Sequence, residues 1–180
     1  MIIYVGGHGA LGGKSHAKHT IEHMDNVGLM FSVYDYTPNF SGRYALDNGA
    51  FSCYLHNKSF DSEIFLRVFY TLGKNADFVI LPDIVASKNS LRFSLEWLKK
   101  LPEQDNYYLS VQDGMKFEDI PSDVLGSIAG IFVGGTKEWK HMTGEYWCNK
   151  AHEHGLKCHI GRVGTLKTLL WADAIRADSV

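Results

Sequence analysis

Polar side chains suited to chemistry recur at the ends of apolar, β-prone segments of this chain. The five segments span residues 44–51, 79–83, 109–114, 131–136 and 158–162. Each of them stops at a carboxylate, an amide, a pair of glycines or a cation. Carboxylates move protons, an amide offers both a donor and an acceptor, and cations hold phosphates. Strands of a parallel barrel open on one face at their carboxyl ends, so this recurrence predicts one active site assembled from several strands.

The two carboxylates of the series, Asp47 and Asp83, each have a structural explanation beside the chemical one. Asp47 precedes Asn48 and Gly49. This pair predicts a tight turn that aims the carboxylate into the mouth of a barrel, or an Asx-turn that only ends the strand. Asp83 follows a proline, and its carboxylate could accept hydrogen bonds from a ring N–H or an amino group. It could equally cap a helix that begins near Ser87.

Gln112 and the glycine pair Gly134 and Gly135 are the neutral members of the series. The Gln112 amide has the donor and the acceptor needed to bind the edge of a nucleobase, although the Asp113-Gly114 pair after it is also a turn signal. Paired glycines remove side chains where a flat ligand approaches the backbone, or they mark an unusual turn. Turns alone do not require five such segments in this order, so the series favours a site.

The elements that would carry these residues alternate between strand and helix. Candidate strands are 1–5, 28–35, 43–47, 77–82, 107–112, 129–134, 157–161 and 176–180. Candidate helices include 61–75, 87–100, 137–155 and 165–175. The alternation predicts an α/β fold, a parallel (β/α)8 TIM-type barrel in one domain over residues 1–180. An open doubly wound sheet is the alternative, but residues 6–9 lack the GxGxxG spacing of a dinucleotide site.

Length and composition set further bounds on the prediction. Barrels of this type usually need about 200 residues or more. The chain has 180 residues and stops inside its eighth candidate strand, so we expect a barrel truncated at or after that strand. A net charge of -2 leaves only a local basic patch for nucleic acid. Three cysteines without a CxxC pair, no signal-peptide pattern and no apolar run of about 18 residues predict a cytoplasmic protein outside the membrane.

The order of the motifs resembles that of the tRNA-guanine transglycosylase superfamily. The motifs lie at 46–51 (LDNGAF), 81–83 (LPD), 111–114 (VQDG), 132–136 (FVGGT) and 159–164 (HIGRVG). They run in order through nearly the whole chain and look closest to the shorter, DNA-acting branch that inserts 7-deazaguanines into phage or bacterial DNA. Each motif is short, but their succession is specific. A phage-encoded member would act in the host cytoplasm.

The resemblance implies a base-exchange glycosyltransferase on a barrel. It would replace guanine in nucleic acid, DNA in preference to tRNA, with a free 7-deazaguanine base such as 7-cyano-7-deazaguanine, and would need no organic cofactor. Asp47 stands where the family has its general acid/base. Asp83 and Gln112 stand where the family recognises the base, and Gly134 and Gly135 where backbone groups contact it. Beside the family's pattern, charge and position place three cations at the same rim as phosphate ligands: Lys137, Lys140 and Arg162.

Two departures from the family's pattern concern the end of the chain. The zinc cluster of the tRNA enzymes would follow the eighth strand, beyond Val180. The family's nucleophilic aspartate lies three residues after an acidic position that Asp178 matches, so it would also fall beyond Val180. Either the product is shortened, or Asp178 acts as the nucleophile, or no covalent intermediate forms. A protein partner or a second copy that completes the site also stays open.

Histidine clusters support a second class of function. One set has i, i+3, i+7 spacing and comprises His16, His19 and His23; the other comprises Cys148, His152, His154 and Cys158. Neither set has a familiar zinc spacing, so no metal site is predicted. The alternatives to base exchange are a metal-dependent TIM-barrel hydrolase and a catalytically silent barrel that binds a base or nucleic acid. The four tryptophans lie on candidate helices, where packing is their expected role: Trp97, Trp139, Trp147 and Trp171.

Overall fold

The computed structural model describes residues 1–6 and 21–180. The residues 7–9 of the glycine-rich segment and the candidate metal ligands His16 and His19 therefore lie outside the described part. The chain forms two compact units, residues 2–80 and residues 81–180 with Met1. We call them the N-terminal unit and the C-terminal unit and describe each by itself.

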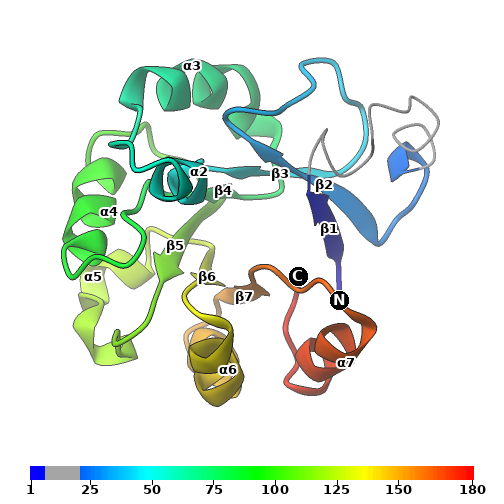
Figure 1. The fold of residues 1–180 in the computed structure, drawn as a ribbon, viewed down its shortest axis with the longest axis vertical. Coiled ribbons are helices and arrows are strands. Elements are labelled where there is room, and N and C mark those ends of the chain that lie inside the picture. Colours follow the sequence, from blue (N-terminus) through cyan, green and yellow to red (C-terminus); the bar gives the residue numbers. More distant parts are fainter. Residues whose placement is uncertain (7–20) are drawn as a thin grey trace. The chain divides into compact units, whose positions relative to one another are not determined.

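The N-terminal unit consists of parallel strands with helices after the third strand (Figure 1). Its strands β1 (Ile3–Gly6), β2 (Val27–Ser32), β3 (Tyr44–Asp47) and β4 (Val79–Ile80) pair in chain order. Its helices are α2 (Ala50–Leu55) and α3 (Ser62–Leu72), followed by the 3₁₀ turn Gly73–Asn75. The strand residues Leu29 and Leu46 and the α3 residues Phe65 and Phe69 are fully buried, which places the core between sheet and helix.

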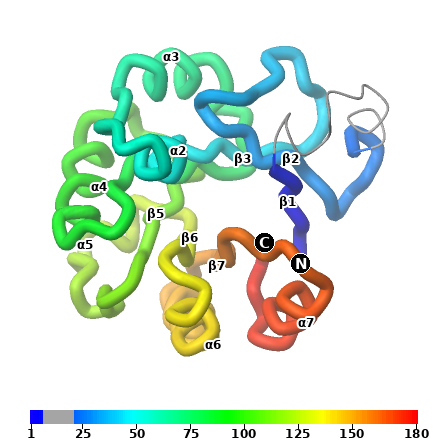
Figure 2. Tube along the Cα trace, viewed as in Figure 1, coloured from blue at the N-terminus to red at the C-terminus, as the bar shows by residue number. Residues whose placement is uncertain are grey.

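The C-terminal unit alternates strand and helix throughout. In Figure 2 its chain can be followed from green to red. Its strands β5 (Tyr107–Val111), β6 (Gly130–Val133) and β7 (Lys157–Ile160) are parallel and adjacent in chain order. Its helices are α4 (Ser90–Leu98), α5 (Ser122–Leu125), α6 (Lys137–Glu153) and α7 (Leu166–Ala174), with a 3₁₀ turn at Phe117–Asp119. Before α4, the backbone N–H of Leu81 donates to Tyr108 O and adds an extended segment beside β5.

Strand register decides which side chains of the C-terminal unit share a face. Ser110 pairs with Phe132, and Phe132 pairs with His159. Because side chains alternate along a strand, these three residues form one row across the sheet. The Phe132 and His159 rings stack with centroids 5.0 Å apart. The opposite parity faces the helices: Cys158 of β7 contacts Cys148 of α6.

The predicted alternation of parallel strands and helices is confirmed, and the fold is α/β. The described residues contain seven strands. The eighth candidate, residues 176–180, contributes only an isolated parallel bridge between Ser179 and His159. The closed eight-stranded barrel therefore stays a prediction. No helix in the described ranges 1–6 and 21–180 is both long and apolar enough to cross a membrane.

Candidate functional site

Asp83 and Gln112 meet in a buried polar cluster at the carboxyl end of β5. Asp83 is 6% exposed and Gln112 is 5% exposed. Asp83 Oδ2 accepts hydrogen bonds from Gln112 Nε2 at 2.5 Å and from Ser110 Oγ at 3.0 Å. Ser110 and Gln112 lie two residues apart on β5 and its extension, so their side chains leave the same face. The structure thus brings together the two side chains that the sequence predicts for base recognition.

The Gln112 amide is also held by the segment that leads into α4. Its Oε1 accepts from the backbone N–H of Ala86 at 2.8 Å, and its Nε2 donates to Ser90 Oγ at 3.1 Å. Helix α4 begins at Ser90 with Asn89 as its N-cap. Asp83 is therefore not the helix cap that its position also allowed. Buried polar groups need such partners, and this network fixes the orientation of the Gln112 amide.

The two glycines after β6 adjoin this cluster and take separate roles. The backbone N–H of Gly134 donates to Val111 O at 2.9 Å, and a side chain at Gly134 would stand 3.6 Å from Ser110 Oγ. Gly135 has φ +74°, and a side chain there would clash with Asp113 Oδ2. Asp113 in turn accepts from the Thr136 backbone N–H at 2.7 Å. Gly134 lies beside the Asp83–Gln112 cluster, whereas Gly135 shapes the loop that starts α6.

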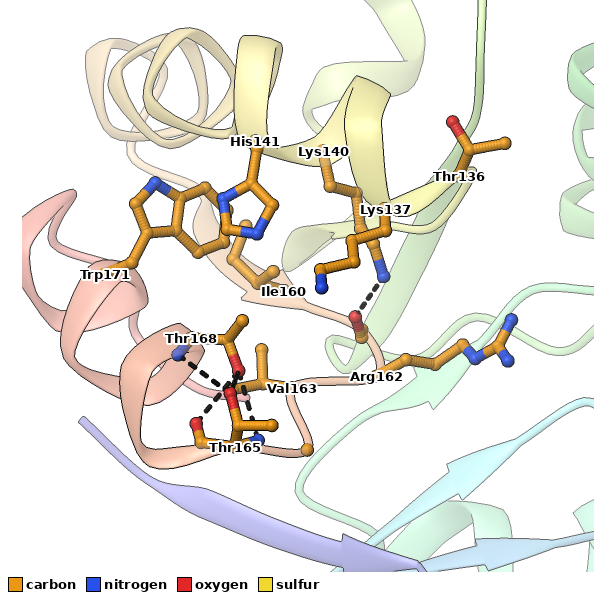
Figure 3. Close-up of a pocket in the computed structure, with 13 residues that line it drawn as sticks. Thr136, Lys137, Lys140, His141, Ile160, Arg162, Val163, Thr165, Thr168 and Trp171 are labelled. Carbon is orange, nitrogen blue, oxygen red and sulfur yellow. Dashed lines mark hydrogen bonds between the residues drawn. The ribbon is translucent and has the colours of Figure 1, made fainter.

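The three predicted phosphate ligands, Lys137, Lys140 and Arg162, line a cavity of about 360 Å³ in the C-terminal unit. It lies between the start of α6 and the loop that joins β7 to α7, and Figure 3 shows side chains from both sides of it. Its remaining lining comes from residues 135–136, His141, 160–161, 163–165, Thr168 and Trp171. We call it the α6–α7 cavity. No acidic residue of the described chain lines it.

Lys140 is the most unusual of these cations because it is only 6% exposed. Its Nζ donates to Gly161 O at 2.5 Å. Burial, and then the neighbouring Arg162, lower the pKa of Lys140 to about 8, while Asp113 opposes this shift. Arg162 has φ 61°, a left-handed conformation that costs a non-glycine residue about 1 kcal/mol or more. Lys140 on α6 and Arg162 in the loop after β7 therefore repel each other, Lys140 from a buried position and Arg162 from a strained backbone.

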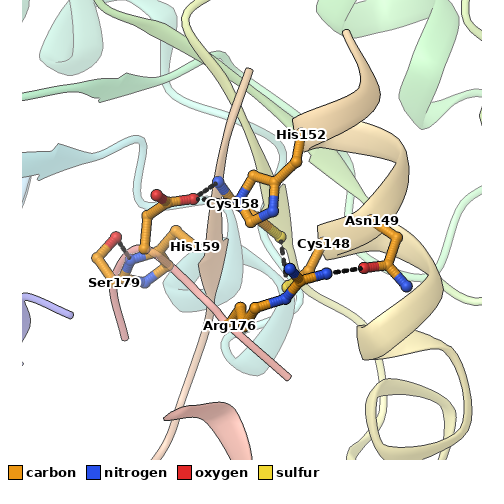
Figure 4. A network of polar contacts seen from close by, with 8 residues as sticks. Cys148, Asn149, His152, Cys158, His159, Arg176 and Ser179 are labelled. Atoms are coloured by element: carbon orange, nitrogen blue, oxygen red, sulfur yellow. Dashed lines mark hydrogen bonds and ion pairs between the residues drawn. The ribbon is translucent and has the colours of Figure 1, made fainter. Parts of the chain in front are cut away.

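Asp178 lies away from these residues, at the amino end of β7. Its Oδ2 accepts from the backbone N–H of Cys158 at 2.7 Å and lies 2.8 Å from His152 Nε2. Figure 4 shows His152, Cys158 and Ser179 in this network. Arg162 follows the opposite, carboxyl end of the same strand. The structure does not bring Asp178 together with Asp83, Gln112 or the α6–α7 cavity.

Asp47 belongs to the N-terminal unit, where it ends β3. It is half-buried. The turn expected after it is present: Gly49 has φ 79°, and Asn48 Oδ1 accepts from the backbone N–H of Ala50 at 2.8 Å. This turn leads directly into α2, so Asp47 stands at a strand-to-helix junction, the position that active-site residues occupy in βα units.

The cysteines and histidines near α6 that could suggest a metal site instead make contacts in pairs. Cys148 Sγ donates to Cys158 Sγ at 3.2 Å, and the His154 ring packs 4.8 Å from Phe117. The hydrogen-bonded pairing with Cys148, and then burial, raise the pKa of the Cys158 thiol. Within the described residues, no group of three or more His, Cys, Asp and Glu side chains is placed to hold a metal ion.

Several contributors to these sites were not singled out from the sequence. Ser110 could have been found from strand parity, because it precedes Gln112 by two positions. Trp171 was expected only to pack, yet it is half-buried and lines the α6–α7 cavity. The sequence feature linked to this position is Gly144 on α6, because a side chain there would meet the Trp171 ring within 3.0 Å. Ser90 gave no signal, because its contact with Gln112 crosses 22 residues of sequence.

Comparison with protein-family models, with curated proteins and with solved structures found no match to this chain. The functional assignment therefore rests on the side chains at the carboxyl ends of its parallel strands and on the resemblance in their order.

Proposed function

We propose that the chain is a base-exchange glycosyltransferase that replaces guanine in nucleic acid, DNA in preference to tRNA, with a 7-deazaguanine. The proposal takes its strands and helices as most of a parallel (β/α)8 barrel. The observation that carries it is the buried contact between Asp83 and Gln112 at the carboxyl ends of adjacent extended segments. A buried carboxylate beside a carboxamide offers the acceptors and donors that the edge of a guanine-like base requires.

Binding of the base would act on the Asp83 carboxylate. A 7-deazaguanine presents a ring N–H and an amino group side by side, and a carboxylate accepts both as charge-assisted hydrogen bonds. In the structure, Asp83 Oδ2 accepts hydrogen bonds from Gln112 Nε2 and Ser110 Oγ. We propose that the ring N–H and amino group of the base replace Gln112 Nε2 as donors to Asp83. The released Gln112 Nε2 can then donate to the carbonyl of the base. Gly134 supports this because its lack of a side chain leaves the neighbouring strand end unobstructed.

Base exchange itself needs two further carboxylate roles. A nucleophilic carboxylate attacks C1′ of the nucleotide while the bond from C1′ to the guanine nitrogen breaks, and a general acid protonates the departing base. The incoming base then loses a proton and displaces the carboxylate from C1′. We propose Asp47 for the proton transfers, since it stands at a strand-to-helix junction. The target nucleotide must be unpaired or flipped out of a duplex to reach such a site.

A second candidate function is binding of the base without exchange. It is favoured by the position of Asp178, whose carboxylate is engaged at the amino end of β7 by Cys158 and His152. We therefore assign no nucleophile within residues 81–180.

Phosphate groups of the nucleic acid would be held by Lys137, Lys140 and Arg162, and such contacts position a substrate without selecting its sequence.

Calorimetry with 7-cyano-7-deazaguanine tests the base site directly. The variants are Asp83→Asn and Gln112→Ala, and the matched control is Asp105→Asn, an exposed residue before the amino end of β5. Loss of a buried partner costs about 1–3 kcal/mol, so affinity should fall about tenfold or more in the two site variants and stay unchanged in the control.

Incubation of the protein with labelled base and either DNA or tRNA then separates the two candidates. Incorporation of label into DNA supports exchange, and binding without incorporation supports the silent alternative. Unchanged affinity in both Asp83→Asn and Gln112→Ala, with the fold intact by circular dichroism, would reject the base site in either form.

A further inference from the structure

The α6–α7 cavity has two chemically different ends. Figure 3 shows Arg162 at one end and Trp171 at the other, with Lys137 and Lys140 between the helix and the loop. The Trp171 and His141 rings lie with centroids 4.2 Å apart. A volume of about 360 Å³ falls in the range of about 300–1,000 Å³ typical of small-molecule sites. Cations at one end and aromatic rings at the other are the complement of an anion joined to a flat ring.

The cationic end of the cavity contains Lys140, a buried charge that a bound anion would pair. Lys140 is almost fully buried, and its Nζ donates a hydrogen bond to an uncharged group, the backbone carbonyl of Gly161. A buried charge is expensive unless it is paired. Asp113, the carboxylate whose charge acts on Lys140, is already engaged by Thr136 through both oxygens. An anion in the cavity would offset the mutual repulsion of Lys140 and Arg162.

The aromatic end is positioned by packing. A side chain at Gly144 would meet the edge of the Trp171 ring, so the missing side chain on α6 lets this ring lie close against the helix. His141 is exposed and Trp171 is half-buried, so the pair keeps open surface. Stacking of a nucleobase on an aromatic side chain contributes about 1–3 kcal/mol and tolerates any base.

We infer that the α6–α7 cavity binds one nucleotide, with its phosphate at Lys137, Lys140 and Arg162 and its base against Trp171 and His141. This site is separate from the Asp83–Gln112 cluster, and it deepens the proposed function if the nucleotide belongs to the nucleic-acid substrate, next to the exchanged position. A free nucleoside monophosphate has the same chemistry. The site itself does not depend on base exchange.

Calorimetry with adenosine 5′-monophosphate, adenosine and inorganic phosphate tests the inference, because adenine lacks the adjacent ring N–H and amino group proposed to bind Asp83, whereas stacking tolerates any base. The variants are Arg162→Gln for the phosphate and His141→Ala for the base; both residues are exposed, so the fold should survive. The matched control is Lys157→Gln, which removes an exposed cation at the amino end of β7. We expect the nucleotide to bind more tightly than adenosine or phosphate. Arg162→Gln should weaken binding of the nucleotide about tenfold or more, and His141→Ala should weaken binding of the nucleotide and of adenosine together.

A short single-stranded oligonucleotide and a single nucleotide distinguish the two sources. Tighter binding of the oligonucleotide that is lost in Arg162→Gln assigns the site to the nucleic-acid substrate, and equal affinities assign it to a free nucleotide. Equal loss of affinity in Lys157→Gln and Arg162→Gln, or no nucleotide binding at all, would overturn the inference. Asp83→Asn should leave nucleotide affinity unchanged. Failure of 7-deazaguanine binding with nucleotide binding intact would therefore reject the base site alone.

Discussion

Asp178 Oδ2 accepts a hydrogen bond from the backbone N–H of Cys158, the second residue of β7. The carboxylate thus accepts from a backbone N–H of β7 of the kind that a neighbouring strand binds in a sheet. The parallel bridge between Ser179 and His159 begins at the next residue. Asp178 therefore organises the start of the last extended segment, at the end of β7 opposite to Arg162.

The first prediction concerns the role of this carboxylate. Asp178→Asn should lower the free energy of unfolding by about 1 kcal/mol, because a charge-assisted hydrogen bond is weakened at a side chain that is 37% exposed. It should leave any incorporation of labelled base unchanged. Urea denaturation measures the first effect, with Asp173→Asn on the exposed surface of α7 as control. Label incorporation that disappears in Asp178→Asn would make Asp178 the nucleophile and refute this role.

The second prediction concerns the loop between β6 and α6. Gly135→Ala places a methyl group against Asp113 Oδ2 at φ +74°, so the loop must shift and the Thr136 contacts must weaken. We expect a loss of about 1–3 kcal/mol in unfolding free energy and weaker nucleotide binding. Gly126→Ala is the control, since nothing lies within 4 Å of the added carbon and φ is -77°. Equal stabilities of the two variants would contradict the proposed role of Gly135.

Much of the C-terminal unit could be predicted because its signals are local. The helix expected at 137–155 is α6 at Lys137–Glu153, and Thr136 caps it by accepting from the Trp139 backbone N–H. The strand expected at 107–112 is β5 at Tyr107–Val111. Apolar runs and caps act within a few residues, so a single sequence carries them. The meeting of Asp83 and Gln112 followed from the rule that parallel strands end on one face.

The parts that escaped prediction depend on contacts between distant residues. The start of α4 at Ser90, later than expected, is linked to Ser90 Oγ, which accepts from Ile84 N–H and so favours an irregular segment before the helix. The eighth strand was expected over 176–180, but in this segment only Ser179 forms a bridge, to His159. The α6–α7 cavity arises where two helix starts and one loop converge. No sequence period marks such a convergence.

The third prediction uses the burial of Lys140. Burial and Arg162 lower its pKa to about 8, with Asp113 acting in the opposite sense and His159 buried on the neighbouring strand. An anion in the α6–α7 cavity favours the protonated lysine. Nucleotide affinity should therefore fall as the pH rises from 7 to 9, a range in which the phosphate group itself is almost fully ionised because its second pKa is about 6. Calorimetry at several pH values measures this. Lys140→Gln should remove the dependence, and a wild-type affinity that is constant over this range would refute the assignment.

The last prediction concerns His159, which is 2% exposed and whose Nδ1 lies 2.9 Å from Ser179 Oγ. Burial, and then the charge of Lys140, lower its pKa to about 3 from an unfolded value of 6.5. Between these values the unfolded chain binds a proton that the folded chain excludes, so stability rises with pH in this window and is lost as the pH falls. From pH 7 to pH 4.5 the loss should be about 2–3 kcal/mol from this residue. Urea denaturation at both pH values tests it against His159→Asn, which should lose this part of the slope, and against the exposed His56→Asn, which should keep it. A slope that His159→Asn leaves unchanged would show that His159 takes up its proton in the folded protein.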